Sequence, residues 1–295
     1  MGNSTEIRHD IGADGSLLLR NVSGAIRLTA SDGTDAVVVV RTDRGSVPEL
    51  NVERGPGRLL VEPPRSGFSF VHRGDGALDF DVVLPRGAKV DVKTVSGDIA
   101  GTGLAGEQNY KTVSGDLHLR GAGGRVSIQT VSGDIRLIDS RRVELSGMTT
   151  SGDVTLAADE IVELRMRTVS GDIRAEGRLG SQRRHSVETV SGDLVLRTSS
   201  GVTVERTRAL DIGRSARQPI VIGDGAAQLS FRSMSGEERI TGPAQVASPG
   251  EPSAPRGESM SEPTATRLDV LRALERGEID VDEAARRLEE VGVDA

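Results

Sequence analysis

The stretch KTVSGDIAGTGLAGEQNYKTVSGDLHL, residues 93–119, contains one short motif twice and decides the fold. Its tripeptide Ser-Gly-Asp begins at Ser96 and Ser114. It returns at Ser132, Ser151, Ser170 and Ser191, so that the spacings are 18, 18, 19, 19 and 21 residues. A fixed period near 20 residues is typical of repeat proteins, in which each repeat is one supersecondary unit.

Weaker copies extend the repeat in both directions. They read NVSGAIRL at residues 21–28 and FRSMSGEERI at residues 231–240. The second copy lies 44 residues after Ser191, which leaves room for one eroded coil around residues 205–223. We therefore assign residues 85–242 to the repeat region.

Alternation of apolar and polar residues around each Ser predicts strands. Apolar residues stand three places after Ser, and mostly small or apolar residues stand five places after it and four places before it. The positions between them are mostly polar and are expected to face solvent. The inward residues of the six complete copies are Ile99, Leu117, Ile135, Val154, Ile173 and Leu194, then Gly101, Leu119, Leu137, Leu156, Ala175 and Leu196, and finally Val92, Tyr110, Ile128, Gly147, Met166 and Val187.

Each copy therefore reads as two short strands joined at a Ser-Gly-Asp corner. One such coil cannot cover its own apolar face, so coils must stack and share a core. Aromatic residues make up only 2% of the chain, which suits a narrow interior of Val, Ile and Leu. We predict an all-β fold, a parallel β-solenoid of stacked coils of about 19 residues.

The rest of the chain divides into three further regions. Residues 1–84 contain irregular strand-like runs and are expected to form an N-terminal β cap or irregular first coils, because an open solenoid end exposes unpaired strand edges. Residues 243–263 contain five prolines and few apolar residues, which predicts a disordered linker. In residues 264–295 the apolar period changes to 3.6, which predicts a small helical hairpin.

This hairpin is too short to build its own core and is expected to bind something, either a partner protein or a second copy of itself. Its apolar residues are the candidate partner-binding residues: Leu268, Leu271, Leu274, Leu288 and Val291, with Ala284 beside the last two.

Composition narrows the classes of function. The chain has no cysteine, so disulfides and thiolate chemistry are excluded. Residues 1–20 lack the apolar run of a secretory signal peptide, and no stretch is apolar enough for a membrane helix. The net charge of -7, with acidic and basic residues mixed, disfavours nucleic acid as a partner. We expect a cytoplasmic protein.

Stacking would align the aspartates of the repeat in one column: Asp98, Asp116, Asp134, Asp153, Asp172 and Asp193. We expect these side chains to cap turn amides, and the alternative is a Ca²⁺ site, because hard oxygen ligands suit that cation. A second column, of Thr94, Thr112, Thr130, Thr149, Thr168 and Thr189, is expected to point inward and bury its hydroxyls.

No residue set predicts catalysis or a cofactor. A polysaccharide lyase or hydrolase would need paired carboxylates or a base together with aromatic platforms. The single tyrosine, Tyr110, is predicted to point inward, as is His185, whereas His118 is predicted to point outward and His9 and His72 precede the repeats. We expect a protein that is not an enzyme.

The repeat resembles the DUF4097 family of bacterial proteins, described as "putative adhesins" or β-strand-repeat proteins. The residues that carry the resemblance are the TVSGD motif followed by Ile or Leu, and the lead-in LPRGAKVDV at residues 84–92. The resemblance covers about residues 17–242. The tail VLRALERGEIDVDEAARRLEEV, residues 270–291, resembles a SHOCT-like helical module, which precedes the repeats in those relatives and follows them here.

Together these observations favour a non-catalytic scaffold or adaptor with a helical tail for protein–protein interaction. The resemblance implies a link to cell-envelope stress and a peripheral position at the envelope. Two other classes remain as alternatives: a self-assembling, cytoskeletal type of β-solenoid and an exported adhesin.

Overall fold

A computed structural model describes residues 4–64, 77–208 and 219–243. All regular elements in these ranges are strands, which confirms the all-β prediction. The chain divides into two compact units, residues 1–245 and 246–295. The predicted helical hairpin and most of the predicted linker lie outside the described residues. The described part of the chain contains no helix that is long and apolar enough to span a membrane.

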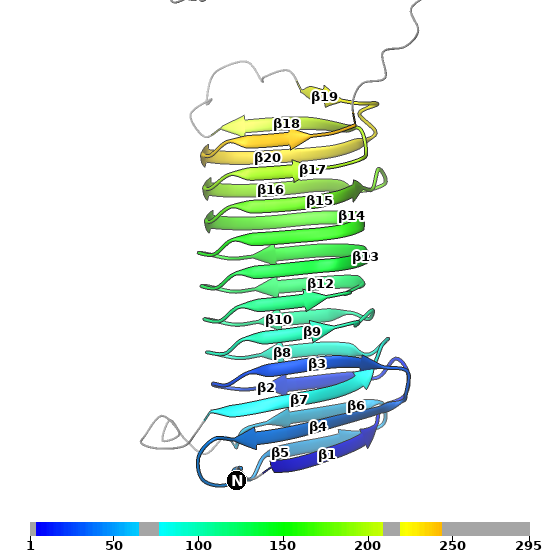
Figure 1. Ribbon diagram of the computed structural model, residues 1–295, viewed down its shortest axis with the longest axis vertical. Coiled ribbons are helices and arrows are strands. Elements are labelled where there is room, and N and C mark those ends of the chain that lie inside the picture. Colours follow the sequence, from blue (N-terminus) through cyan, green and yellow to red (C-terminus); the bar gives the residue numbers. More distant parts are fainter. Residues whose placement is uncertain (1–3, 65–76, 209–218, 244–295) are drawn as a thin grey trace, which may run out of the picture. The chain divides into compact units, whose positions relative to one another are not determined.

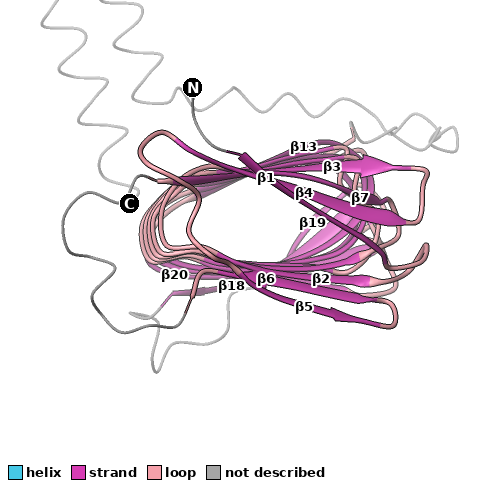
Figure 2. Cartoon of the chain, turned by 90° about the horizontal axis from the view of Figure 1, so that it is seen from below, coloured by secondary structure: helices cyan, strands magenta, loops and turns pink. Residues whose placement is uncertain are grey.

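The repeats form a β-solenoid-like stack of coils, and each coil contributes one strand to each of two walls (Figures 1 and 2). Strands of successive coils pair in parallel. Wall A contains β2 (Ser16–Arg20), β8 (Lys89–Lys93), β10 (Gln108–Lys111), β12 (Gly124–Gln129), β16 (Arg184–Ser191) and β20 (Ala227–Ser235). Wall B contains β3 (Ile26–Ser31), β9 (Ile99–Thr102), β11 (Leu117–Arg120), β15 (Ile173–Leu179), β17 (Leu194–Arg197) and β21 (Glu238–Thr241).

Two longer strands, β13 (Ile135–Met148) and β14 (Val154–Ser170), run from wall B into wall A. The stack thus has eight coils, each with one turn at the same register. The serine of every turn pairs with the serine of the next coil, in the order Ser23, Ser96, Ser114, Ser132, Ser151, Ser170, Ser191 and Ser235.

The core lies between the two walls, and the predicted alternation is confirmed. All the predicted inward residues of the six copies are buried. Side-chain sizes compensate between coils at two places. A Cβ on Gly101 would lie 2.7 Å from Cδ2 of Leu119, and a Cβ on Gly147 would lie 2.5 Å from the Met166 sulfur. The two glycines therefore make room for inward side chains of the neighbouring coils.

The N-terminal region contains both a coil and a cap. Strands β2 and β3 form the first coil, which stacks directly on β8 and β9 although about 60 residues separate them in sequence. The intervening chain covers the outer side of this coil. There β6 (Arg58–Glu62) pairs with β2, and β7 (Leu78–Pro85) pairs with β3. Antiparallel strands β5 (Asn51–Gly55), β4 (Asp35–Thr42) and β1 (Ser4–Asp10) complete the cap.

The C-terminal end corrects one sequence prediction. We expected an eroded coil around residues 205–223, between the coil of Ser191 and that of Ser235. Instead β20 pairs directly with β16, and β21 pairs directly with β17. Strand β18 (Val202–Arg208) lies on the outer side of β20, and β19 (Ile220–Ile222) pairs antiparallel to β18. The 44 residues between Ser191 and Ser235 fit either an extra coil or an excursion outside the stack, because a spacing in sequence does not show which strands pair.

Candidate binding surface

The turn edge of the stack is built by the repeated Ser-Gly-Asp motif. At its centre Gly133 has a φ of 127°, and a Cβ there would lie 2.2 Å from the Gly115 carbonyl oxygen of the preceding coil. Both the left-handed backbone and this close approach require glycine. The same contact with the preceding glycine recurs at the other turns, so the motif sets how closely the coils stack.

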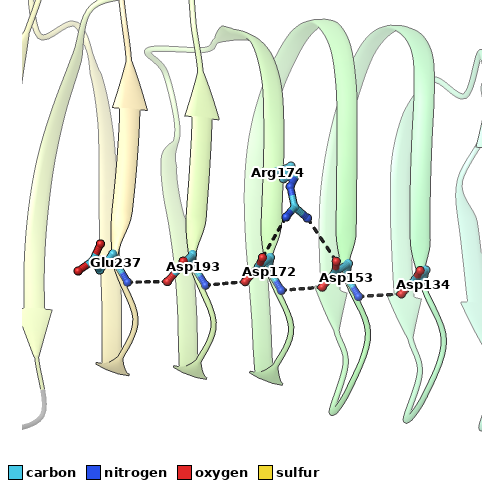
Figure 3. A network of polar contacts seen from close by, with 6 residues as sticks. All are labelled: Asp134, Asp153, Asp172, Arg174, Asp193 and Glu237. Carbon is cyan, nitrogen blue, oxygen red and sulfur yellow. Dashed lines mark hydrogen bonds and ion pairs between the residues drawn. The ribbon is translucent and has the colours of Figure 1, made fainter.

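The aspartates of the motif form a continuous hydrogen-bond ladder, part of which is shown in Figure 3. Each Asp accepts, through Oδ1, the backbone N–H of the Asp in the next coil. The N···O distances are 2.9 to 3.0 Å from Asp98 through Asp116, Asp134, Asp153, Asp172 and Asp193 to Glu237. The predicted capping of turn amides is confirmed, and the amide belongs to the neighbouring coil instead of the same turn.

At the two ends of the ladder the Asp position is occupied by other residues. In the first coil the Asp position is occupied by Ala25, whose N–H donates to Oδ1 of Asp79 on cap strand β7 at 2.8 Å. The cap thus supplies the carboxylate that a further coil would have supplied. In the last coil Glu237 takes the Asp position.

The second carboxylate oxygens of this column bear on the calcium alternative. Arg174 donates to Oδ2 of Asp153 at 3.3 Å and to Oδ2 of Asp172 at 3.0 Å. Since Oδ1 of each Asp accepts an amide, only Oδ2 remains for a cation, and Arg174 occupies this oxygen in Asp153 and Asp172. Among the described residues no group of three or more His, Cys, Asp or Glu side chains is arranged to hold a metal ion.

The threonine column points inward, as predicted, with all six side chains buried. Four of these hydroxyls donate to the carbonyl of the serine two residues later, at 3.0 to 3.2 Å: Thr112, Thr130, Thr149 and Thr168. They brace the turn from the core side, while the aspartates brace it from the solvent side.

Two buried residues that often act in catalysis have structural roles here. The Tyr110 hydroxyl donates to Gln108 at 3.0 Å, and burial raises the pKa of this tyrosine. His185 is fully buried, accepts the Leu164 N–H at Nδ1 (3.2 Å) and donates from Nε2 to the Gly180 carbonyl (2.8 Å). Burial lowers the pKa of His185, so its neutral form is favoured. His118 is exposed, as predicted.

Sequence reasoning missed a groove of about 950 Å³ on the corner opposite the Ser-Gly-Asp turns. The groove forms because the corners of the second and third coils consist mainly of Gly and Ala, whereas the corner of the fourth coil carries the larger side chains of Arg141 and Arg142. Its floor includes Gly103, Gly121 and Gly123, and its walls include four arginines: Arg86, Arg125, Arg141 and Arg142.

Most of these arginines are already paired. Arg125 contacts Glu144 at 3.3 Å, and Arg142 contacts Glu160 at 4.0 Å. Within the described ranges Arg141 has no ion-pair partner. Asp139, on the same rim, is the one described non-glycine residue with a positive φ, 55°, and pairs with Arg120. Arg86 is paired as well, with Asp32 at 3.7 Å, so Arg141 is the one groove arginine without an ion pair among the described residues.

The candidate partner-binding residues of the tail, Leu268, Leu271, Leu274, Leu288 and Val291, lie outside the described residues. Their prediction is therefore unchanged. His72 also falls outside the described ranges.

Comparison with known proteins finds a family model that matches part of the repeat region. A family model described as Toastrack DUF4097 matches residues 66–209, which supports the resemblance inferred from the TVSGD motif. No curated protein matches the chain.

Three solved structures from bacteria match the chain at low identity. A "putative adhesin" from Bacteroides fragilis is 12% identical with a TM-score of 0.46, and the match covers 81% of this chain and 97% of that one. A "putative lipid binding protein" from Parabacteroides distasonis is 11% identical with a TM-score of 0.30, covering 82% and 93% of the two chains. A "putative cell adhesion protein" from Clostridium sporogenes is 9% identical with a TM-score of 0.27, covering 82% and 100%.

Proposed function

We propose that this protein is a non-catalytic scaffold in the cytoplasm that presents the coil stack as a binding surface and recruits a protein partner through its C-terminal segment. The observation that carries the proposal is that side chains of types common in catalysis are engaged in structural hydrogen bonds here. His185 and one oxygen of each ladder aspartate link neighbouring coils, and the buried Tyr110 hydroxyl bonds to Gln108 within its own strand. These groups maintain the fold and are not free to act on a substrate.

The C-terminal segment supplies the second half of the proposal. Residues 1–245 form a compact unit without it, so the stack does not need the tail for its core. The sequence nevertheless carries regularly spaced leucines there, Leu268, Leu271 and Leu274, which an isolated short hairpin could not bury. A linker of some twenty residues would let this segment act at a distance and would raise the local concentration of its partner. The resemblance to the SHOCT-like module favours a partner at the inner face of the envelope.

The test is affinity capture from the native cell with three forms of the protein, followed by mass spectrometry. They are the full chain, a chain ending at Pro243, and a full chain with Leu271→Asp and Leu274→Asp. A fourth form, Arg272→Glu, changes a charged residue of the same segment and serves as a matched control. We expect one set of envelope or signalling proteins to co-purify with the full chain and the control, and to be absent from the other two.

Two results would contradict the proposal. Recovery of the protein alone, in large assemblies that survive removal of residues 244–295, would identify a self-assembling polymer. Equal capture by the full chain and by the chain ending at Pro243 would show that the tail does not recruit. The truncated chain must keep the far-UV β-sheet signal and the melting transition of the coil stack for either reading, and we expect it to do so.

A further inference from the structure

One residue of the repeat is apolar and faces solvent in almost every coil. It immediately precedes the serine of each turn, and its side chain is between 41% and 56% exposed wherever it is Val or Met. We call this column the valine ridge, and it consists of Val22, Val95, Val113, Val131, Thr150, Val169, Val190 and Met234. In the fifth coil, where Thr150 interrupts it, Met148 in the same coil is 51% exposed.

The ridge is continuous because the coils are in register. The serine that follows each ridge residue pairs with the serine of the next coil, so ridge residues of neighbouring coils lie about 4.8 Å apart. Over eight coils the ridge is about 34 Å long. Contiguous exposed apolar surface of this kind marks interaction sites, whereas single exposed valines do not. Packing within the coil does not explain why these positions are apolar, because the residue before each ridge residue, a threonine in six coils, points into the core and the ridge residue itself points to solvent.

The two flanks of the ridge carry opposite charge. On the wall A side, three residues before each serine, the column is mostly basic: Arg20, Lys93, Lys111, Gln129, Met148, Arg167, Glu188 and Arg232. On the wall B side, two residues after each serine, it is acidic in seven coils: Asp98, Asp116, Asp134, Asp153, Asp172, Asp193 and Glu237. The side chains of both columns face outward, and the exposed serines lie between the ridge and the acidic column.

We propose that the valine ridge binds the valine ridge of a second copy of this chain, around a two-fold axis parallel to the direction of stacking. Such an axis places the basic flank of each copy opposite the acidic flank of the other, so the charges are complementary. A two-fold axis perpendicular to the stacking direction would make the ridges antiparallel and would oppose basic to basic and acidic to acidic flank. Charge therefore selects the parallel arrangement.

The parallel arrangement also matches the repeat. Both copies have the same coil spacing, so each ridge residue meets its own twin and the contact is isologous. The contact surface would be about 34 Å long and at most about 17 Å wide, since the two flanking columns are five positions apart in the sequence. This corresponds to at most about 1,200 Å² buried in total, which is the lower limit for specific interfaces, so we expect a dimer that dissociates on dilution.

Disulfide cross-linking of the full chain tests the arrangement directly, because the protein has no cysteine of its own. The variants are Val95→Cys, Val131→Cys and Val190→Cys, each made singly, and the control is Val83→Cys. Val83 is 42% exposed on cap strand β7, away from the ridge. A disulfide needs Cα atoms no more than about 7 Å apart, a limit that only closely apposed positions satisfy.

Under a mild oxidant we expect all three ridge variants to form covalent dimers and the Val83 control to remain uncross-linked. Cross-linking at Val131 alone would indicate antiparallel ridges and would overturn the proposal, because only residues near a perpendicular axis meet their twins. Absence of cross-linking at all three positions would overturn it as well, whether the protein is monomeric or associates through another surface.

A second measurement separates charge from fold. We expect Lys93→Glu with Lys111→Glu to weaken the concentration-dependent dimer at least tenfold in sedimentation equilibrium, because these positions would then face the partner's acidic column. Lys93→Arg with Lys111→Arg should leave the dimer unchanged. Equal dimerisation of the two double variants, with unchanged circular dichroism, would contradict the charge-selected geometry. This inference is independent of the proposed scaffold function and of the tail.

Discussion

Within the Ser-Gly-Asp turn, each position has a different physical role. The glycine permits the left-handed backbone and the close contact with the preceding coil, and the aspartate accepts the amide of the next coil. The serine backbone carries the parallel bridge between coils. These roles can be tested one residue at a time.

Replacing Gly133 with Val should destabilise the protein by at least about 3 kcal/mol. The valine would be strained at a φ of 127°, and its Cβ would collide with the backbone oxygen of Gly115. The measurement is chemical denaturation followed by circular dichroism. Gly123→Ala is the matched control: a Cβ there has no neighbour closer than 3.7 Å, so stability should change little. An unchanged denaturation midpoint for Gly133→Val would show that the turn is misplaced.

Asp134→Ala should cost up to about 1 kcal/mol, because the Asp153 N–H loses its acceptor. Asp134→Asn should be neutral or slightly stabilising, since an amide oxygen can replace Oδ1 and one charge leaves a column of like charges. Thermal melting of the two variants and the parent distinguishes these effects. Equal losses for Ala and Asn would mean that the negative charge matters more than the hydrogen bond.

His185 should make stability fall with decreasing pH. Its pKa is lowered by burial, against the opposing effects of the Gly180 carbonyl and Glu163. Below about pH 6.5 the unfolded chain therefore binds a proton that the folded chain does not, and up to about 1.4 kcal/mol is lost per pH unit until the folded residue also titrates. The stability advantage of the parent over His185→Gln should narrow between pH 7 and pH 5. A constant difference across this range would contradict the assignment.

At the scale of the strand, packing is set between neighbouring coils. Gly147 on β13 and Met166 on β14 are paired in register, and the sulfur and terminal methyl of the methionine lie where a Cβ on Gly147 would be. Gly147→Ala alone should destabilise by about 1–3 kcal/mol through overpacking. Adding Met166→Val should restore most of that loss, and a double-mutant cycle from denaturation curves should give a clear coupling energy. Additive effects would show that the two positions do not share space.

The repeat elements were largely predictable from the sequence because a strand's alternation records which side of it faces the core. This is why Ile99, Tyr110 and Met166 were placed inside correctly. Alternation contains no information about which strand lies beside which. The direct pairing of β20 with β16, and of β2 with β8, was therefore not predicted, since a local pattern cannot indicate where a long excursion returns.

The binding surface was predictable only in part. The aspartates were expected to cap turn amides. That each one caps an amide of the neighbouring coil could not be predicted, because this depends on how closely the coils stack. The valine ridge had a signal that was overlooked: a valine before the serine in nearly every copy, at a position whose inward-facing neighbour is threonine. The arginine groove had no comparable signal in the sequence. It forms because corners built from Gly and Ala stack beside a corner with larger side chains, and the sequence does not show which corners are neighbours.

At the scale of the coil stack, the ends determine whether coils can add to one another. On wall A the outer side of β20 in the last coil is paired with β18, which in turn pairs with β19. On wall B, β21 is the last strand and carries Glu238 and Arg239. Charged residues and covering strands are common means of preventing edge-to-edge association.

Replacing residues 199–226 with a four-residue turn, like residues 180–183 between β15 and β16, tests this role. The last coil can still form, but the outer edge of β20 loses β18. We expect assemblies larger than those of the parent, growing with concentration in light scattering. The corresponding control keeps β18 and β19 and shortens only residues 209–218. If both variants gave the same particle sizes as the parent, β18 and β19 would not control association.

Both caps are excursions of the chain between a terminal coil and the coil next to it, and this affects how the stack would respond to tension. A solenoid whose last coil is free can unzip from its end, breaking one ladder at a time. Here a pull on residue 243 first reaches β21, which is hydrogen-bonded only to β17, and then β20, which is hydrogen-bonded to β16 on one side and β18 on the other. Two ladders must break before β20 is released, so the wall A half of the last coil should resist mechanical unfolding more strongly than its β21 half.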